Sequence, residues 1–146
     1  MKKSLHKQRG SLMLESLIAI LIFSLGILSL VALLGASVND TASAKYRTEA
    51  SLLVNQVIGE MWAGDKTNAS LVANYGTTSG APYLAWKARV VQTLPGVVDA
   101  VEGTPGSGQN LPTIVIDGTL VTVTVFWQAP SESGRHNFVA ATRIHE

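Results

Sequence analysis

Few side chains in this sequence have the types and spacing that catalysis or metal binding requires. His6, His136 and His145 lack the spacing of zinc ligands, and no glutamate-bearing helical motif accompanies them. Ser131 and Ser133 stand in a turn-like stretch without a nucleophile-elbow pattern or a nearby base. We therefore expect no enzymatic activity, no metal and no cofactor, and we interpret His136 and His145 as surface residues.

Two other groups of residues could contact a ligand. The stretch 103–112 is rich in glycine, but neither a Lys-Ser/Thr pair nor a helix follows Gly108, as a phosphate-binding loop would require. Trp62, Trp86 and Trp127 could form an aromatic surface, although large apolar side chains on amphipathic elements usually lie in the core. We predict a loop for the first group and core positions for the three tryptophans.

Glu15 is the residue whose position has the clearest chemical significance. It stands directly before the stretch from Ser16 to Asn39, which contains no charged residue. A carboxylate on an apolar helix costs up to about 3 kcal/mol at the centre of a bilayer and less near its surface, so by default it marks a functional position. The alternative is a glutamate that reaches the lipid headgroups and has no further role.

The composition indicates that one part of the chain does not lie in water. Hydrophobic residues make up 47% of the 146 residues, and charged residues only 14%, against roughly 25% in an average soluble domain. Four basic residues precede Gly10, so their removal would change the net charge from +1 to −3. This balance does not indicate a nucleic-acid-binding surface. There is no cysteine, which excludes disulfides, a lipid-modified cysteine and thiolate metal sites.

The apolar stretch is long enough to cross a membrane. About 20 residues at about 1.5 Å each span the hydrocarbon core of a bilayer, and Leu17 to Leu34 consists largely of apolar residues. The basic leader should stay in the cytoplasm. A cleaved secretory signal, with a cut near Gly35 or Ser43, and a plain membrane anchor remain alternatives, although a plain anchor does not explain Glu15.

The segment Arg9 to Ile20, RGSLMLESLIAI, resembles the class III signal of type IV prepilins and type II secretion pseudopilins. The resemblance implies that a prepilin peptidase cleaves between Gly10 and Ser11 and methylates the new N-terminus at Ser11. Glu15 is then the fifth residue of the mature chain, where it serves assembly by facing the amino group of Ser11 on a neighbouring subunit.

The segments Phe23 to Leu30, Leu94 to Gly96 and Val123 to Trp127 resemble minor pilins of the PilV type. This resemblance implies a minor type IV pilin, a structural subunit that supports pilus assembly and initiation. Its partners would be other pilin or pseudopilin subunits, bound through the N-terminal helix, the prepilin peptidase and the inner membrane. It would pass once through that membrane with its globular domain in the periplasm, and then enter the filament.

Two other functions remain open. A type II secretion pseudopilin uses the same leader and anchor, and the sequence separates it poorly from a pilin. A tip-associated module that binds a surface, as an adhesin, or DNA belongs to another class. No cluster of aromatic and basic residues supports a nucleic-acid partner.

The periodicity of the sequence predicts an α+β fold in which a long N-terminal helix packs on a small antiparallel β-sheet. We expect three parts: a leader over 1–10, a transmembrane and filament-core helix over 11–38, and a periplasmic pilin-like domain over 39–146. The helix should run from about Leu12 to Trp62 and end at Gly64-Asp65. Its second half is amphipathic, with one apolar face formed by Tyr46, Ala50, Leu53, Val57 and Met61.

The remaining elements follow from turn residues and alternation. We predict a loop over 68–82, a short helix over 84–93 that Pro95-Gly96 ends, and strands over 113–117, 119–128 and 136–144. Asp117-Gly118 suits a tight hairpin and 130–135 a second turn. The face of the middle strand that should cover the long helix is formed by Val121, Val123, Val125 and Trp127.

Overall fold

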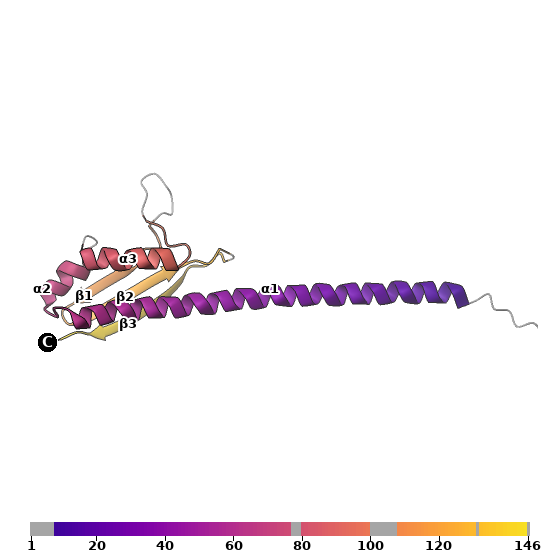
Figure 1. Cartoon of the computed structure of the whole chain (residues 1–146), viewed down its shortest axis with the longest axis horizontal. Coiled ribbons are helices and arrows are strands. Elements are labelled where there is room, and N and C mark those ends of the chain that lie inside the picture. The colour runs from indigo at the N-terminus through magenta and orange to yellow at the C-terminus, as the bar shows by residue number, and fades with distance from the viewer. Residues whose placement is uncertain (1–7, 77–79, 100–107, 131, 146) are drawn as a thin grey trace, which may run out of the picture. The chain divides into compact units, whose positions relative to one another are not determined.

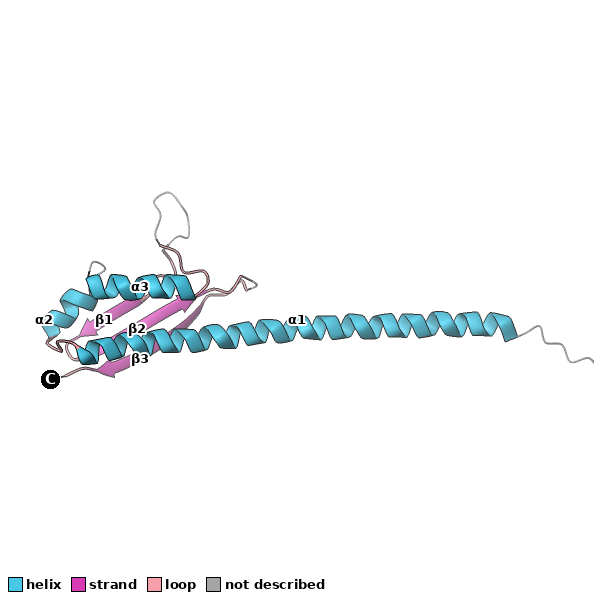
Figure 2. Cartoon of the chain, in the orientation of Figure 1, coloured by secondary structure: helices cyan, strands magenta, loops and turns pink. Residues whose placement is uncertain are grey.

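The computed structural model describes residues 8–76, 80–99, 108–130 and 132–145, with side chains from Ser11 onward. The chain has the predicted α+β arrangement (Figures 1 and 2). It divides into two compact units between Thr41 and Ala42. The elements are α1 (Gln8–Ala63), α2 (Asn68–Leu71), the π-helical turn η1 (Val72–Gly76), α3 (Ala81–Thr93), β1 (Thr113–Asp117), β2 (Leu120–Trp127) and β3 (His136–Arg143).

Helix α1 confirms the prediction of one long N-terminal helix. It begins at Gln8 and ends at Ala63, close to the expected bounds. No proline occurs before Pro82 to interrupt it. The main-chain nitrogen of Gly64 still donates to the carbonyl of Glu60 at 3.2 Å, and the chain then leaves the helix, as the Gly64-Asp65 pair indicated.

In the second unit, the part of α1 from Ala42 onward contributes one face to the core. The predicted apolar face is confirmed, since Ala50, Leu53, Val57 and Met61 are buried and Tyr46 is partly buried. Val54 is also fully buried. A helical face of this width requires a second layer to cover it, and the sheet and α3 supply that layer.

The sheet has three antiparallel strands in the order β1-β2-β3. Cross-strand partners in the centre are Ile114 with Val123, and Val123 with Ala140. Gly118, at a φ of 58°, turns the chain between β1 and β2, where a side chain would be strained. The predicted inner face of β2 is confirmed, because all four of its side chains are buried: Val121, Val123, Val125 and Trp127.

The prediction of a loop over 68–82 was wrong for most of that stretch. Thr67 caps α2 by accepting a hydrogen bond from the nitrogen of Ser70 at 3.4 Å. Leu71 and Tyr75 are buried in the core, so tertiary contacts stabilise turns whose composition is loop-like. Helix α3 begins earlier than predicted because Pro82 is well suited to a first helical turn. Residues 77–79 lie outside the described part of the chain.

The end of α3 packs against the end of β2. Gly96 has a φ of 70°, and a Cβ placed on it would lie 2.8 Å from the carbonyl oxygen of Gln128. Beside it, the nitrogen of Gln128 donates to the carbonyl of Pro95 at 3.0 Å. Pro95-Gly96 therefore ends the helix as predicted and also joins it to the sheet. Of the predicted loop over 103–112, residues 108–112 form no helix or strand, and 103–107 lie outside the described residues.

Candidate assembly site on the N-terminal helix

The predicted cleavage position lies near the start of α1. Because the helix begins at Gln8, the peptide bond between Gly10 and Ser11 belongs to its first turns. Helix ends fray, since their terminal amides lack partners within the helix. A peptidase can therefore reach this bond more readily than one in the helix interior, and cleavage there stays a prediction. His6 and the basic residues before Gln8 lie outside the described residues.

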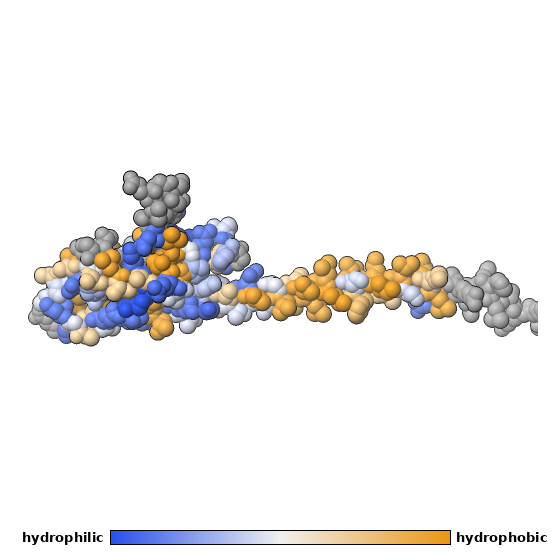
Figure 3. Space-filling view, turned by 45° about the horizontal axis from the view of Figure 1, so that its top comes forward, coloured by the Kyte–Doolittle hydropathy of each residue, from blue (hydrophilic) through white to orange (hydrophobic). Residues whose placement is uncertain are grey.

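From residue 11 to residue 41, every side chain of α1 is exposed. The large apolar side chains lie on all sides of the helix, from Leu12 at 60% exposure to Val38, also at 60%. Figure 3 shows this segment as a nearly continuous hydrophobic surface. It is long and apolar enough to cross a membrane. A helix that is apolar all round requires lipid or other helices to cover it.

The serines within this segment do not interrupt its apolar character. The hydroxyls of Ser16, Ser24 and Ser29 donate to the carbonyl oxygens one turn earlier, those of Leu12, Ile20 and Leu25, at 2.7 to 2.9 Å. These hydroxyls need no water, so they are compatible with a hydrocarbon environment.

Glu15 differs from these serines. Its side chain is exposed and forms no hydrogen bond or ion pair with any residue that the structure describes. Ser11 and Glu15 are four residues apart, so both lie on the same face of α1. The structure thus presents an unpaired carboxylate and the predicted new N-terminus together, at the start of an apolar helix.

Gly26 and Gly35 lie within the same segment. A Cβ added to either glycine would meet no atom within 4 Å. The described part of this chain therefore offers no internal packing reason for these glycines. Small residues in an apolar helix allow other helices to approach closely.

The two C-terminal histidines are exposed, as predicted, but each contacts an aromatic ring. His136 stacks on Trp127 with ring centroids 5.6 Å apart, and its Nε2 pairs with the carboxylate of Glu132. His145 meets the edge of Trp62 at 5.9 Å. Among the described residues, no three potential metal ligands form a group. Ser131 lies outside the described residues.

One of the three tryptophan predictions was wrong. Trp86 and Trp127 are buried, but Trp62 is 40% exposed. It lies in the last turn of α1, next to Met61, the last residue of the buried apolar face. Its side chain points away from that face. The ammonium group of Lys66 lies 5.7 Å from the centroid of its ring. This cation–π contact stabilises the tryptophan side chain at the surface.

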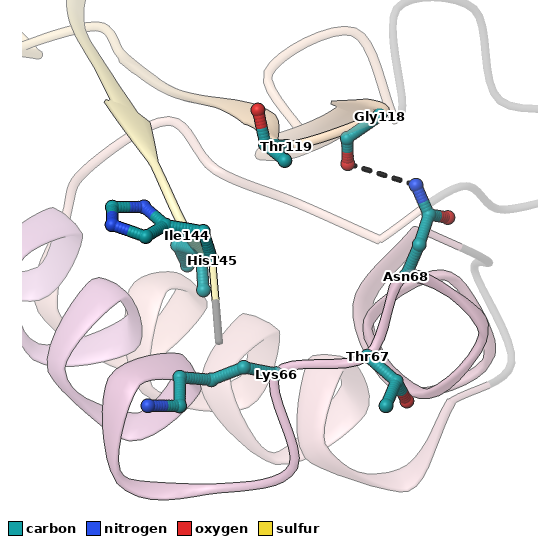
Figure 4. A pocket seen from close by; sticks show the side chains of 7 residues that line it. All are labelled: Lys66, Thr67, Asn68, Gly118, Thr119, Ile144 and His145. Atoms are coloured by element: carbon teal, nitrogen blue, oxygen red, sulfur yellow. Dashed lines mark hydrogen bonds between the residues drawn. The ribbon is translucent and has the colours of Figure 1, made fainter.

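Lys66 and His145, which both contact this tryptophan, line an open pocket of about 380 Å³ (Figure 4). The side-chain nitrogen of Asn68 donates to the carbonyl of Gly118 at 2.8 Å across one of its walls. Its side chains include no acid paired with a base, so this arrangement does not point to catalysis. The lining residues are Lys66, Thr67, Asn68, Gly118, Thr119, Ile144 and His145.

A second, smaller pocket brings together residues that the sequence did not associate. Ser43 and Arg47 of α1 line it with three residues of the sheet, Trp127, His136 and Asn137. No local pattern could have indicated it, because the two groups are separated by most of the globular unit in sequence.

The residues with functional character in this structure are therefore Glu15, the apolar segment that follows it and the small polar pocket. Comparisons with protein-family models, with curated proteins and with solved structures found no match.

Proposed function

We propose that this protein is a minor type IV pilin. It enters the inner membrane by its apolar helix, loses residues 1–10 and then joins a filament through the same helix. The observation that carries the proposal is the helical segment 11–41, which is exposed on every side. Near its start lies the carboxylate of Glu15, which has no partner among the described residues. Lipid can cover the apolar side chains, but it offers no cationic partner within its hydrocarbon core.

The membrane state follows from the polar groups of the helix. The back-bonded serines and the helical main chain need no partner from outside, so the segment can remain in lipid as a single span. The basic residues before Gly10 favour a cytoplasmic N-terminus. We propose that the unit from Ala42 onward lies in the periplasm.

Assembly replaces lipid contacts by contacts between helices. Because lipid tails are as apolar as leucine, the preference for one packing arrangement must come from shape and polar pairing. The exposed glycines Gly26 and Gly35 provide places for close approach. Glu15 provides the polar pairing, since its carboxylate can meet the amino group of Ser11 on a neighbouring subunit. Opposite charges attract more strongly in an apolar filament core than in water.

A type II secretion pseudopilin requires the same helix and the same carboxylate. Its genes would lie beside those of a secretin and secreted hydrolases, whereas a pilin gene would lie beside a pilus motor. Gene neighbourhood therefore distinguishes the two assemblies without affecting the proposed role of Glu15.

The proposal is tested by neutralising Glu15. We expect Glu15→Gln and Glu15→Ala to insert into the membrane normally, because removing the charge makes the segment more favourable in lipid. The amount of subunit in sheared filaments, relative to the membrane fraction, should fall by about tenfold or more, as when one member of a buried charge pair is lost.

Glu49→Gln is the matched control. Glu49 is also a glutamate of α1, but it pairs with Lys45 of its own chain at 3.7 Å. Its substitution should leave the filament fraction unchanged, and Glu15→Asp should restore part of the loss. Equal incorporation of the Glu15→Gln chain and the unmodified chain would refute the pairing mechanism.

A further inference from the structure

The small pocket of the second unit contains several side chains that can donate hydrogen bonds. It encloses about 110 Å³. Ser43 and Arg47 lie one turn apart on α1, so they present their side chains on one face. Asn137 and His136 lie at the start of β3, and Trp127 ends β2.

Three of these donors have no partner among the residues that the structure describes. The guanidinium group of Arg47, the amide of Asn137 and the indole nitrogen of Trp127 form no hydrogen bond with any described residue. Trp127 is only 3% exposed, but its indole nitrogen still reaches the surface, because Arg89 Nε is the one enclosed side-chain nitrogen or oxygen without a partner among the described residues.

Ser43 adds a further free donor. Neighbouring hydroxyls of α1, such as those of Thr41 and Thr48, donate to the carbonyl one turn earlier at 2.8 and 3.0 Å. The hydroxyl of Ser43 makes no such bond within the described residues. It is therefore available to a ligand in the pocket.

The charges around the pocket favour an anion. Arg47 has no acidic partner among the residues that the structure describes. Glu132 lies in the turn before β3, and its carboxylate pairs with Nε2 of His136. Lys45, the other cation on this part of α1, is engaged by Glu49. Arg47 is thus a cation at the pocket whose charge no acidic side chain pairs with among the described residues.

We propose that this pocket binds a phosphate group. Arginine, hydroxyl and indole donors together suit an anion with several acceptor oxygens, and arginine matches phosphate with two parallel hydrogen bonds. A metal cation would instead require carboxylates or free imidazoles, and Glu132 and His136 already pair with each other.

The phosphate can come from a phospholipid headgroup or from solution. Ser43 follows Val38, the last large apolar residue of the exposed segment, by only five positions in the sequence. The pocket therefore includes residues of α1 that closely follow, in sequence, the predicted transmembrane segment 11–38. The lipid source rests on the proposed membrane insertion, whereas the site itself does not.

The experiment follows the indole N–H signals of the three tryptophans by NMR, with the full chain in maltoside micelles, which contain no phosphate. Loss of one signal in Trp127→Phe assigns Trp127. Inorganic phosphate, but not chloride at equal ionic strength, should shift the Trp127 signal in a saturable way. Arg47→Gln should weaken this affinity by about tenfold or more. Lys45→Gln, with the same change of charge, should alter it by less than about twofold.

The two sources are separated in nanodiscs of digalactosyldiacylglycerol with and without phosphatidylglycerol. A shift of the Trp127 signal that depends on phosphatidylglycerol and on Arg47 supports the headgroup as the ligand. A response to inorganic phosphate alone supports the site with a soluble ligand. No response to either probe, a response only to duplex DNA, or equal losses in Arg47→Gln and Lys45→Gln would overturn the proposal. None of these outcomes depends on filament incorporation, so failure of this site is distinguishable from failure of the proposed pilin function.

Discussion

The indole nitrogen of Trp86 donates a hydrogen bond to the main-chain carbonyl oxygen of Leu53 at 2.9 Å. Both residues are buried: Trp86 is completely enclosed, and Leu53 is 6% exposed. A helical carbonyl normally accepts from the amide four residues later, so this bond uses the second lone pair of the oxygen. It joins α3 to α1 at one point in the core.

Replacing Trp86 by phenylalanine should destabilise the globular unit. The substitution keeps a ring but removes the donor, which leaves a poorly satisfied carbonyl and a small cavity, at a cost of about 2–4 kcal/mol. Denaturant unfolding of the full chain in micelles, followed by tryptophan fluorescence, measures this loss. Trp62→Phe is the control at the surface and should change the free energy of unfolding by less than about 0.5 kcal/mol. Equal effects of the two substitutions would contradict the role of the buried bond.

Gly96 and Gly118 provide a matched pair for testing the contact between α3 and β2. Both have positive φ, at 70° and 58°, so an alanine at either position incurs backbone strain of about 1 kcal/mol. Only at Gly96 would the new Cβ also clash, 2.8 Å from the oxygen of Gln128. We expect Gly96→Ala to lower the thermal midpoint clearly more than Gly118→Ala. A larger fall of the thermal midpoint in Gly118→Ala would contradict a steric clash at Gly96.

Stability should fall at alkaline pH through Tyr83. Burial raises the pKa of its hydroxyl above the usual 10.0, and the hydroxyl donates to the carbonyl of Pro112 at 2.9 Å. The folded chain therefore retains this proton at a pH where the unfolded chain releases it. The contribution to stability is complete below about pH 10 and is lost as the pH rises through the folded pKa. Urea unfolding between neutral pH and pH 11 tests this, and Tyr83→Phe should make the decline shallower.

Cleavage should occur between Gly10 and Ser11. In the proposed function, the charged leader, the glycine and the directly following apolar helix would place this bond at the cytoplasmic surface of the membrane, where a prepilin peptidase would act. Intact mass and N-terminal sequencing of protein from membranes measure the position of the cut. A chain that begins near Ser37 or Lys45 would instead identify an ordinary secretory signal. Gly10→Val should leave the full precursor in the membrane.

The fragment 39–146 should be soluble, folded and monomeric. The core of the globular unit includes Ala50, with Tyr46 packed against it, and none of the described side chains of residues 11–38 belongs to it. The fragment starts three positions before Ala42, where the second compact unit begins. Circular dichroism and sedimentation of the fragment provide the measurement. Aggregation under mild conditions, or the spectrum of a disordered chain, would contradict the predicted division into domains.

Elements with a strong local period were predictable. The three- and four-residue spacing from Tyr46 to Met61 predicts a helix with one buried face, and the alternation from Val121 to Trp127 predicts a strand with one buried face. In both cases a short stretch of sequence contains the whole signal, because the period of the side chains follows from the backbone geometry. The position of Glu15 beside an uncharged apolar stretch is local in the same way, so the candidate assembly site could be identified from the sequence.

Features that depend on contacts between distant segments were decided by the tertiary structure. The stretch 68–76 is loop-like in composition, but burial of Leu71 and Tyr75 stabilises its helical turns. Trp62 and Trp86 are the same residue type on amphipathic helices, and only the position of the sheet makes one exposed and the other buried. The polar pocket likewise requires α1 and β3 to meet.

The sequence by itself therefore determined the long apolar helix, the carboxylate of Glu15 directly before the uncharged stretch 16–39, and the alternation of the strands. Each follows from side-chain chemistry within a few turns or residues. The tertiary structure alone decided which distant residues meet, such as Trp86 and the carbonyl of Leu53, or Arg47 and Trp127 at one pocket. Those pairings arise when separate amphipathic faces bury each other. A one-dimensional pattern does not specify which faces will meet.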